Sequence, residues 1–512
     1  MKRFSICLVL ILTAIVCSVV VVHAQAKYVA VVVIDGMRPD YMDIAATPNL
    51  KKLMSAGTYY DEAWVGGVVN NTPPSHATIS TGCFTRTHGI VAFTWKDPTT
   101  GEEYNPTKLK PVENGALAKM VSDRHLPSLA RLVKERYPDA RTAAVGAHKF
   151  HAVGSLAADS SDCTVFSGGR RSNVELGLEG SPDDVGDGDF VVGQRPSNEI
   201  LKDVRALTSK GDAWGMDSAI VVLKHLKPRV LLINLPSVDG VGHSCGGIRS
   251  PEVMKPVVEE ADRQVGKLLE AYKALGIYEE TLFIVTADHG MMAAQPPVEH
   301  KLLQEALDKF GTKVVTSTDT GPVWISDSSK AKDVVEYVMA KRPAAASAGY
   351  YKVKEGGKYR YKASPATLKS LGPKLAKTYK YLLSTIACAN GPDIFFCSRE
   401  MSPIPADFPK RGRHYQIAWG AQHIPLVLAG PGVKQGFVSK SPARLVDIAP
   451  TALALMGVKP KGMDGIALAD ALLNPTEKQQ SAQNRVNKKL ASARDTLRAQ
   501  PTYDPGAVSG EQ

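Results

Sequence analysis

Runs of valine, isoleucine, leucine and alanine recur along this chain, and stretches with the polar and apolar spacing of helices separate them. The clearest runs cover residues 28–34, 142–147, 229–235, 281–286 and 425–430. Uninterrupted apolar runs of this length are typical of strands that are buried on both faces of a parallel sheet. Because helices alternate with these strands, the pattern predicts an α/β protein: a three-layer α/β/α sandwich with a mostly parallel central sheet.

The segment 250–276 carries the strongest helical pattern. Ser250 can cap the helix, and Pro251 suits its first position, where the missing N–H would have had no partner anyway. Apolar side chains recur on one face of this segment, at Val257, Ala261, Val265, Leu268 and Tyr272. That spacing predicts a long helix packed against the sheet between the third and fourth strands.

The ends of the chain and two internal segments depart from this alternation. Lys2 and Arg3 precede an apolar stretch and the small residues of VHAQA, which predicts a signal peptide over 1–26 and a secreted or periplasmic protein, with an uncleaved N-terminal anchor as the alternative. The rest divides into a main domain over 27–474, with a loop excursion at about 155–200 and an insertion or subdomain at about 345–412, and a polar C-terminal tail over 475–512.

Composition narrows the class of partner. The formal net charge of +11 favours anionic substrates or surfaces, and no nucleic-acid recognition motif accompanies the basic runs. We therefore expect a small-molecule partner, while the oligomeric state stays open. Five cysteines follow the N-terminal stretch, and none has C-x-x-C spacing. Cys388 and Cys397 could close a short loop in an oxidising compartment.

Acidic residues and histidines follow three of the apolar runs. Asp35 follows the first, Asp239 and His243 the third, and Asp288 and His289 the fourth. Ligands of open α/β sheets bind beyond the carboxyl ends of the strands, so these side chains are expected to meet at one edge. Several carboxylates at one point repel each other unless a cation lies between them, so the pattern predicts a divalent metal site.

Two further residues add chemistry, although each has an ordinary explanation. Thr72 precedes Pro73 and should begin a helix, where backbone N–H groups and the helix dipole favour a phosphate; a simple N-cap would look the same. Asp239 and His243 can both bind one cation if the turn between them is helical, since residues four apart share a face. His414 lies in a loop of glycine and arginine and, taken alone, would be a surface histidine.

The ordered set of motifs resembles the alkaline phosphatase superfamily, most closely its type I phosphodiesterase/nucleotide pyrophosphatase branch, with related bacterial phosphomonoesterases and phosphonoacetate hydrolases. The resemblance covers about residues 28–470 and rests on IDGMRPD, NNTPPSHATISTG, THGI, DGVGHSCGG, TADHGM, HIPLVLAGPGV and DIAPTALALMGV.

This resemblance implies two zinc ions, with manganese or iron as alternatives. Asp35, Thr72, Asp288 and His289 would hold one ion, and Asp239, His243 and His414 would hold the other. Thr72 would attack phosphorus to give a phosphothreonine intermediate, and the two cations, about 4 Å apart, would clamp the attacking and leaving oxygens.

Departures from the family pattern concern the substrate. Phe93 stands where the family usually has an asparagine that holds a phosphate oxygen, so a neighbour such as Asn71 or Thr94 is needed as its replacement, or the chemistry differs. Where monoesterase-like relatives carry Lys-x-Arg, this chain has Lys149 and His151, which are candidate substrate-binding or catalytic residues. Sulfatase activity is disfavoured, because Thr72 cannot become formylglycine.

These features predict a secreted two-metal hydrolase of phosphate esters, with diesters slightly favoured over monoesters. Two alternatives stay open: a phosphonate C–P hydrolase of the same superfamily, and a relative that binds metal and phosphate with impaired turnover because of Phe93.

Overall fold

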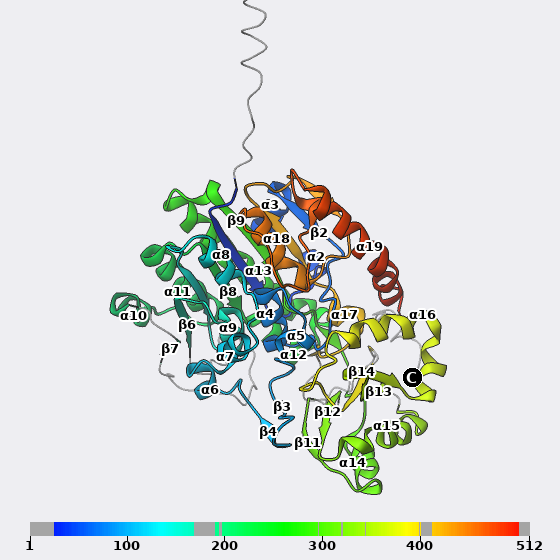
Figure 1. Ribbon diagram of the computed structural model, residues 1–512. Coiled ribbons are helices and arrows are strands. Elements are labelled where there is room, and N and C mark those ends of the chain that lie inside the picture. Colours follow the sequence, from blue (N-terminus) through cyan, green and yellow to red (C-terminus); the bar gives the residue numbers. More distant parts are fainter. Residues whose placement is uncertain are drawn as a thin grey trace, which may run out of the picture.

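A nine-stranded sheet forms the centre of the molecule (Figure 1). The computed structural model describes residues 25–167, 190–193, 197–294, 296–318, 321–343, 345–398, 400 and 412–500. Across the sheet the strands are β18 (Phe437–Ser439), β2 (Thr58–Tyr60), β17 (Leu426–Ala429), β9 (Thr281–Thr286), β1 (Tyr28–Ile34), β8 (Val230–Leu235), β5 (Thr142–Gly146), β6 (Cys163–Ser167) and β7 (Phe190–Gly193).

The middle of this sheet is parallel, as the apolar runs predicted. Strands β9, β1, β8, β5 and β6 run in one direction, whereas β17 is antiparallel to β9 and β7 is antiparallel to β6. Strand β1 lies between β8 and β9, with Ile34 opposite Leu235 and Val33 opposite Thr286. These three strands therefore end at the same edge, and the residues that follow them meet there.

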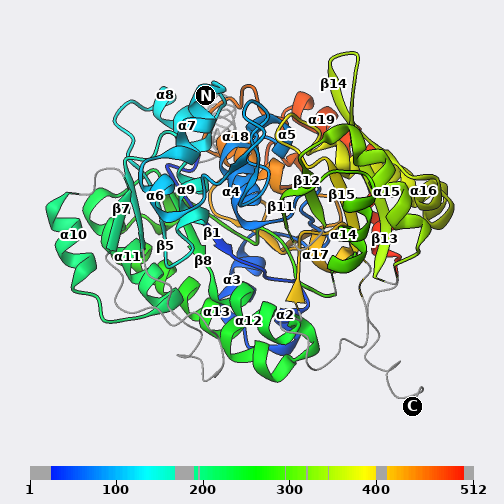
Figure 2. The same cartoon turned by 90° about the horizontal axis from the view of Figure 1, so that it is seen from below.

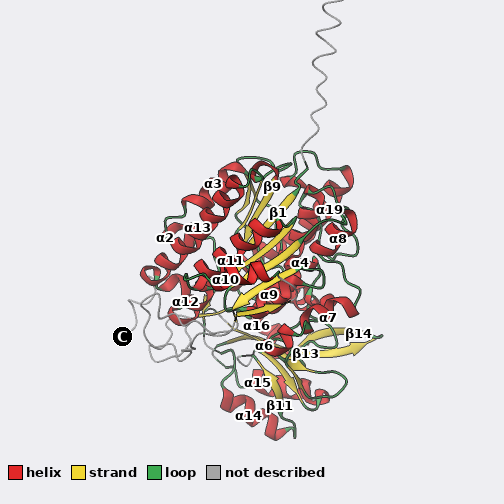
Figure 3. Ribbon diagram, turned by 90° about the vertical axis from the view of Figure 1, so that its left-hand side faces the viewer, coloured by secondary structure: helices red, strands yellow, loops and turns green. Residues whose placement is uncertain are grey.

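Helices cover both faces of the sheet, which confirms the three-layer prediction (Figure 3). One layer contains α2 (Tyr41–Ile44), α3 (Pro48–Ala56), α11 (Gly211–Leu226), α12 (Ser237–Cys245) and α13 (Pro251–Ala274). The other contains α4 (Thr72–Thr81), α5 (Thr85–His88), α8 (Leu129–Arg136), α9 (Phe150–Ala157) and α18 (Ile448–Leu455).

Helix α13 begins at Pro251 and buries the apolar face that its spacing predicted, including Val257, Val265 and Leu268. Its cap differs from the expectation. The hydroxyl of Ser250 donates to the carbonyl of Cys245, at the end of α12, and accepts no helix N–H. The Ser250 hydroxyl therefore links the start of α13 to the end of α12 and does not cap α13.

A second, smaller sheet lies beside the first (Figure 2). Its strands, in order, are β11 (Val314–Ser317), β12 (Pro322–Ile325), β15 (Ile394–Ser398), β13 (Ala346–Glu355) and β14 (Lys358–Ala363). The helices α14 (His300–Lys309), α15 (Ala331–Ala340) and α16 (Pro365–Ser384) accompany it. The predicted insertion at 345–412 includes β13, β14 and β15. Strands β11 and β12 of the same sheet precede residue 345 and follow α14.

Other predicted segments are only partly described. The interval 155–200, expected as a loop, contains the end of α9, strands β6 and β7 and the start of α10 (Asn198–Arg205). Segment 475–512 contains α19 (Glu477–Arg498), in which Leu490 and Leu497 are buried. Most of the predicted signal peptide, residues 1–24, lies outside the described residues.

Two further findings concern the cysteines and the membrane. Cys388 and Cys397 are free thiols, so the loop closure considered for them is not formed. Within the described ranges, every helix is too short or too polar to cross a bilayer.

Candidate active site

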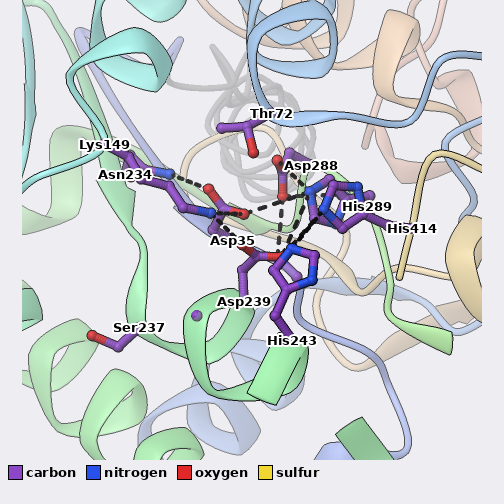
Figure 4. Close-up of polar contacts among 12 residues, drawn as sticks. Asp35, Thr72, Lys149, Asn234, Ser237, Asp239, His243, Asp288, His289 and His414 are labelled. Atoms are coloured by element: carbon purple, nitrogen blue, oxygen red, sulfur yellow. Dashed lines mark hydrogen bonds and ion pairs between the residues drawn. The ribbon is translucent and has the colours of Figure 1, made fainter. Parts of the chain in front are cut away.

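The three strand ends bring their acidic and histidine side chains together, as Figure 4 shows. Asp35 directly follows β1, and Asp288 and His289 directly follow β9. Asp239 and His243 lie on α12, which begins two residues after β8 and places them one helical turn apart. Asp35, Asp239, Asp288 and His289 are at most 3% exposed. A buried cluster of three carboxylates is therefore built from segments about 200 and 50 residues apart in sequence.

Thr72 is the first residue of α4, and its hydroxyl points toward these carboxylates (Figure 4). The side chain is 2% exposed. Pro73 and Pro74 follow it and have no N–H, and the N–H of Ser75 donates to the carbonyl of Asn71. The first turn of α4 therefore offers a bound phosphate fewer backbone N–H groups than an ordinary helix start. Charge on a bound phosphate has to be balanced mainly by cations and side chains.

The histidines of the cluster all have the same protonation pattern. Each Nδ1 lies within hydrogen-bond distance of a carbonyl, which can only accept, so each Nδ1 carries the proton. His243 donates to Gly412 at 2.8 Å, His414 to Asn70 at 2.9 Å and His289 to Gly290 at 2.9 Å. In the neutral rings, every Nε2 is therefore a bare lone pair. Metal-binding histidines are commonly oriented in this way by their second nitrogen.

These bare atoms face one another. The Nε2 atoms of His243 and His414 are 3.1 Å apart, and neither has a proton to donate. Oδ1 of Asp239 lies 3.4 Å from the first and 3.6 Å from the second. His289 Nε2 lies 3.2 Å from Oδ2 of Asp288. Among the described residues, Asp239 Oδ1, Asp288 Oδ2 and His289 Nε2 have no hydrogen-bond partner.

The arrangement fits divalent cations, because lone pairs this close repel unless positive charge lies between them. Two groups have ligand atoms that all lie within 4.8 Å of each other: Asp239 with His289 and His414, and Asp35 with Asp288 and His289. His289 belongs to both groups. The structure thus brings together six of the seven predicted metal ligands, with Thr72 facing them.

Lys149 also enters this cluster. It lies just before α9, and its ammonium contacts Asp239 Oδ2 at 2.5 Å and Asp35 Oδ1 at 2.9 Å. Burial alone would lower the pKa of Lys149, but the two carboxylates outweigh burial and raise it. Lys149 therefore stays charged and supplies a positive group between Asp35 and Asp239.

The pKa values follow from burial and from these neighbours. Burial would raise the pKa of Asp239, but Lys149 and the neighbouring histidines hold it well below its usual range. Burial and the like charge of Asp35 raise the pKa of Asp288 well above its usual range. Burial lowers the pKa of His289 to about 3. Burial also holds the pKa of His414 well below its usual range. His289 and His414 are thus neutral, as metal ligands must be, whereas Asp288 needs a cation to stay ionised.

The remaining predicted residues are Phe93, Asn71, Thr94 and His151. The ring of Phe93 packs edge-on against His151, with centroids 4.7 Å apart. Asn71 is fully buried, and neither atom of its amide has a partner within the described ranges. The hydroxyl of Thr94 is 2.5 Å from that of Thr316, on the second sheet. Thr94 is thus engaged elsewhere and is a poor replacement for the missing asparagine.

Sequence reasoning missed three residues that support the site. Asn234, in β8, donates to Oδ2 of Asp35 at 3.1 Å and to Nε2 of His76 at 2.9 Å. His76 donates from Nδ1 to the carbonyl of Thr72 at 2.7 Å. Asn234 could have been predicted, because it is the one polar residue in the apolar run LLINL. Asp212, at the start of α11, could not, because an acidic residue is common in the first turn of a helix.

Asp212 holds the helix that carries two of the predicted ligands. Its Oδ1 accepts from the N–H of Ser237 at 3.1 Å and from the Ser237 hydroxyl at 2.8 Å. Ser237 is the first residue of α12, so Asp212 occupies the place of a capping group. Burial raises the pKa of Asp212 to about 7.

Asp212→Ala is therefore expected to weaken the binding of a divalent cation about tenfold, because α12 loses its anchor. Asp212→Asn keeps an acceptor for both bonds and should stay close to wild type. Titration of the metal-free protein with Zn²⁺, followed by calorimetry, checks this. Equal affinities of the alanine and asparagine variants would show that Asp212 does not position the ligands.

Comparison with known proteins gives a family match. The profile of the family described as type I phosphodiesterase / nucleotide pyrophosphatase matches residues 29–373. An uncharacterized pyrophosphatase/phosphodiesterase of Schizosaccharomyces pombe is 24% identical over 353 residues, which are 64% of this chain and 58% of that protein. The chain spans about half the length of the curated relatives it matches over long stretches.

Solved structures share the fold. The alkaline phosphatase PafA superposes with a TM-score of 0.63 at 19% identity, covering 88% of this chain and 99% of that one. Murine ectonucleotide pyrophosphatase/phosphodiesterase 5, solved in an inactive form in complex with AMP, gives a TM-score of 0.56 at 17% identity, covering 89% of this chain and 99% of that one. At these identities, the likeness establishes the fold.

Proposed function

Because the chain belongs to the type I phosphodiesterase / nucleotide pyrophosphatase family, we propose that it is a metal-dependent hydrolase of phosphate esters with Thr72 as nucleophile. One observation carries this proposal. Bare carboxylate and imidazole atoms converge at the sheet edge, and the hydroxyl of Thr72 points toward them. A site that only stabilised the fold would pair these atoms with donors, because buried unpaired acceptors are costly.

We assign two zinc ions to the cluster, with manganese or iron as alternatives. One would be held by Asp35, Thr72, Asp288 and His289, and the other by Asp239, His243 and His414. Cations bound there lower the pKa of a coordinated hydroxyl and neutralise charge on the reacting phosphate. The shared position of His289 between the two ligand groups supports closely spaced sites.

The residues of the chain then account for the remaining steps. The hydroxyl oxygen of Thr72 forms a bond to phosphorus while the bond from phosphorus to the leaving oxygen breaks. The leaving oxygen takes up the proton that the Thr72 hydroxyl loses and departs as an alcohol. Water next cleaves the phosphothreonine, so two in-line displacements retain the configuration at phosphorus. Lys149 lies among the carboxylates and is placed to pair with an oxygen of the phosphate.

The charge of the site favours diesters over monoesters. Lys149 supplies one positive side chain, and His151, two residues on, is neutral because burial and the charge of Lys149 hold its pKa well below the ordinary value. A diester carries one negative charge near neutral pH, whereas a monoester carries up to two. We therefore infer a small phosphodiester or nucleotide as substrate. The signal-like segment 1–26 supports export to the periplasm or the medium.

Hydrolysis of p-nitrophenyl esters tests the activity. Purified protein supplied with Zn²⁺ is expected to release p-nitrophenolate from bis-p-nitrophenyl phosphate, and more slowly from p-nitrophenyl phosphate. The same protein stripped with a chelator should be inactive and should recover when zinc is returned. If the zinc-loaded protein shows no turnover of either ester above buffer, the proposed function is wrong.

A further inference from the structure

The proposed function makes no use of the basic segment 352–380. This segment contains nine lysine or arginine residues and one acidic residue, Glu355, so it carries most of the formal net charge of +11. It forms the end of β13, strand β14 and most of α16. The hairpin of β13 and β14 projects from the body of the molecule (Figure 2). Positive charge is thus concentrated on one projecting part of the second sheet.

A groove of about 980 Å³ lies beside this hairpin and is called here the basic groove. Its lining comes from the hairpin, the end of α16, the loop 387–389 and α5, and it includes none of the described carboxylates and histidines of the proposed active site. The charged residues that line it are Arg86, Glu355, Lys358, Arg360, Lys362 and Lys380. The groove is therefore a separate candidate site.

Acidic partners leave three of these cations unpaired. Lys362 pairs with Glu355 at 2.5 Å, and Arg86 pairs with Asp464 at 2.9 Å. The remaining cations, which are exposed and form no ion pair within the described part of the chain, are Lys358, Arg360 and Lys380. Like charges along one groove repel each other, and a bound anion would relieve that repulsion.

The aromatic rings of the groove are occupied. Tyr359 alternates with the cations of β14, but the ammonium groups of Lys352 and Lys354 lie over its ring, 5.7 and 5.5 Å from the centroid. The hydroxyl of Tyr361 donates to the carbonyl of Pro392 at 2.7 Å, which holds this side chain in the wall. Proteins that bind single-stranded nucleic acid stack bases on open rings. Recognition in this groove therefore depends on charge.

Basic residues on an exposed edge strand also have a purely structural role, because they discourage pairing with the edge of another sheet. Strand β14 is such an edge. That role accounts for Lys358 and Arg360, but Lys380 lies on α16 and lines the same groove. A second element thus adds positive charge at this place, which indicates a ligand.

We propose that the basic groove binds a linear polyanion, a polymer with a negative group on each repeating unit and no bases. Cations from the hairpin and from α16 pair with successive charges of the polymer, and an uncharged polymer gains nothing there. This binding concentrates the protein on an anionic matrix without involving Thr72. The inference does not depend on the proposed function.

The probe is fluorescently labelled dextran sulfate, with uncharged dextran of the same length as its control. Fluorescence anisotropy at low ionic strength gives the affinity of the purified protein. We expect dextran sulfate to bind, more weakly as salt is added, because salt screens exposed charges. Dextran should not bind. Equal binding of the two polymers, or no binding of dextran sulfate, would overturn the inference.

A triple variant, Lys358→Gln, Arg360→Gln and Lys380→Gln, tests the location. It should bind dextran sulfate about 100-fold more weakly, at about fivefold for each basic residue near an anionic surface. The control has the same net charge and replaces three exposed lysines on other helices: Lys51→Gln, Lys255→Gln and Lys301→Gln. It should bind like wild type. Equal losses in the two triple variants would show that the groove is not the site.

Chemical acetylation of wild type needs no variant and decides the question even if a variant folds poorly. Bound dextran sulfate should protect Lys358 and Lys380 and leave Lys51, Lys255 and Lys301 reactive, and uniform protection would overturn the inference. A single-stranded oligodeoxynucleotide, or vesicles that contain phosphatidylglycerol, should bind more weakly than dextran sulfate. Tighter binding of either would show that the ligand class is wrong.

Discussion

Replacing Thr72 by alanine is expected to lower kcat/KM for bis-p-nitrophenyl phosphate by about 10⁴-fold or more, while the protein keeps its fold. Loss of the nucleophile in other hydrolases that form covalent intermediates has effects of this size. Thr72 begins α4, and Asn71 precedes it as the cap residue, so alanine at position 72 removes the hydroxyl without removing a capping bond. Steady-state assays of wild type and variant under identical zinc loading give the comparison.

Thr72→Ser is the matched control, because serine keeps the hydroxyl and removes only a methyl group. We expect it to retain activity within about 100-fold of wild type, clearly above the alanine variant. Acid quenching of wild type during turnover, followed by mass spectrometry, should detect phosphate on Thr72. An alanine variant that keeps more than a tenth of wild-type activity would exclude Thr72 as the nucleophile.

The strand ends show why much of this site could be predicted from sequence. Asp35, Asp239 and Asp288 each follow an apolar run, and parallel strands that are neighbours in a sheet end at the same edge. The D-x-x-x-H spacing places both side chains on one face because α12 begins at Ser237, just before Asp239. The fold class followed for the same reason, since buried parallel strands need long apolar segments.

Tertiary contacts account for what the sequence could not supply. Lys149 follows β5, and only the order β1-β8-β5 places its ammonium between Asp35 and Asp239. The ring nitrogen that carries the proton in each histidine is set by a backbone carbonyl, of Gly412, Asn70 or Gly290. The position of a backbone carbonyl cannot be predicted from residue types. The second sheet was only partly predicted, since its short strands do not differ from loops in composition.

Removal of His289 is expected to give the second large effect. His289→Ala should lower zinc affinity at the site of Asp35 and Asp288, because its single Nε2 lone pair lies 3.2 Å from Asp288 and 3.6 Å from Asp35, closer than the 4.0 Å to Asp239. The loss should be at least about 100-fold, the upper end of the effect of altering a residue that only supports a ligand. Activity should fall with the metal content measured by mass spectrometry.

His243→Ala provides the contrast, since His243 belongs to the Asp239 side of the cluster, where it faces His414. It should lose one zinc per chain and keep the other. The exposed His300, at the start of α14, serves as a control for histidine removal, and His300→Ala should bind metal like wild type. The double variant His243→Ala/His289→Ala should lose both ions. If it kept one, His289 and His243 would bind the same ion, and the assignment of the ligands to two separate cations would be wrong.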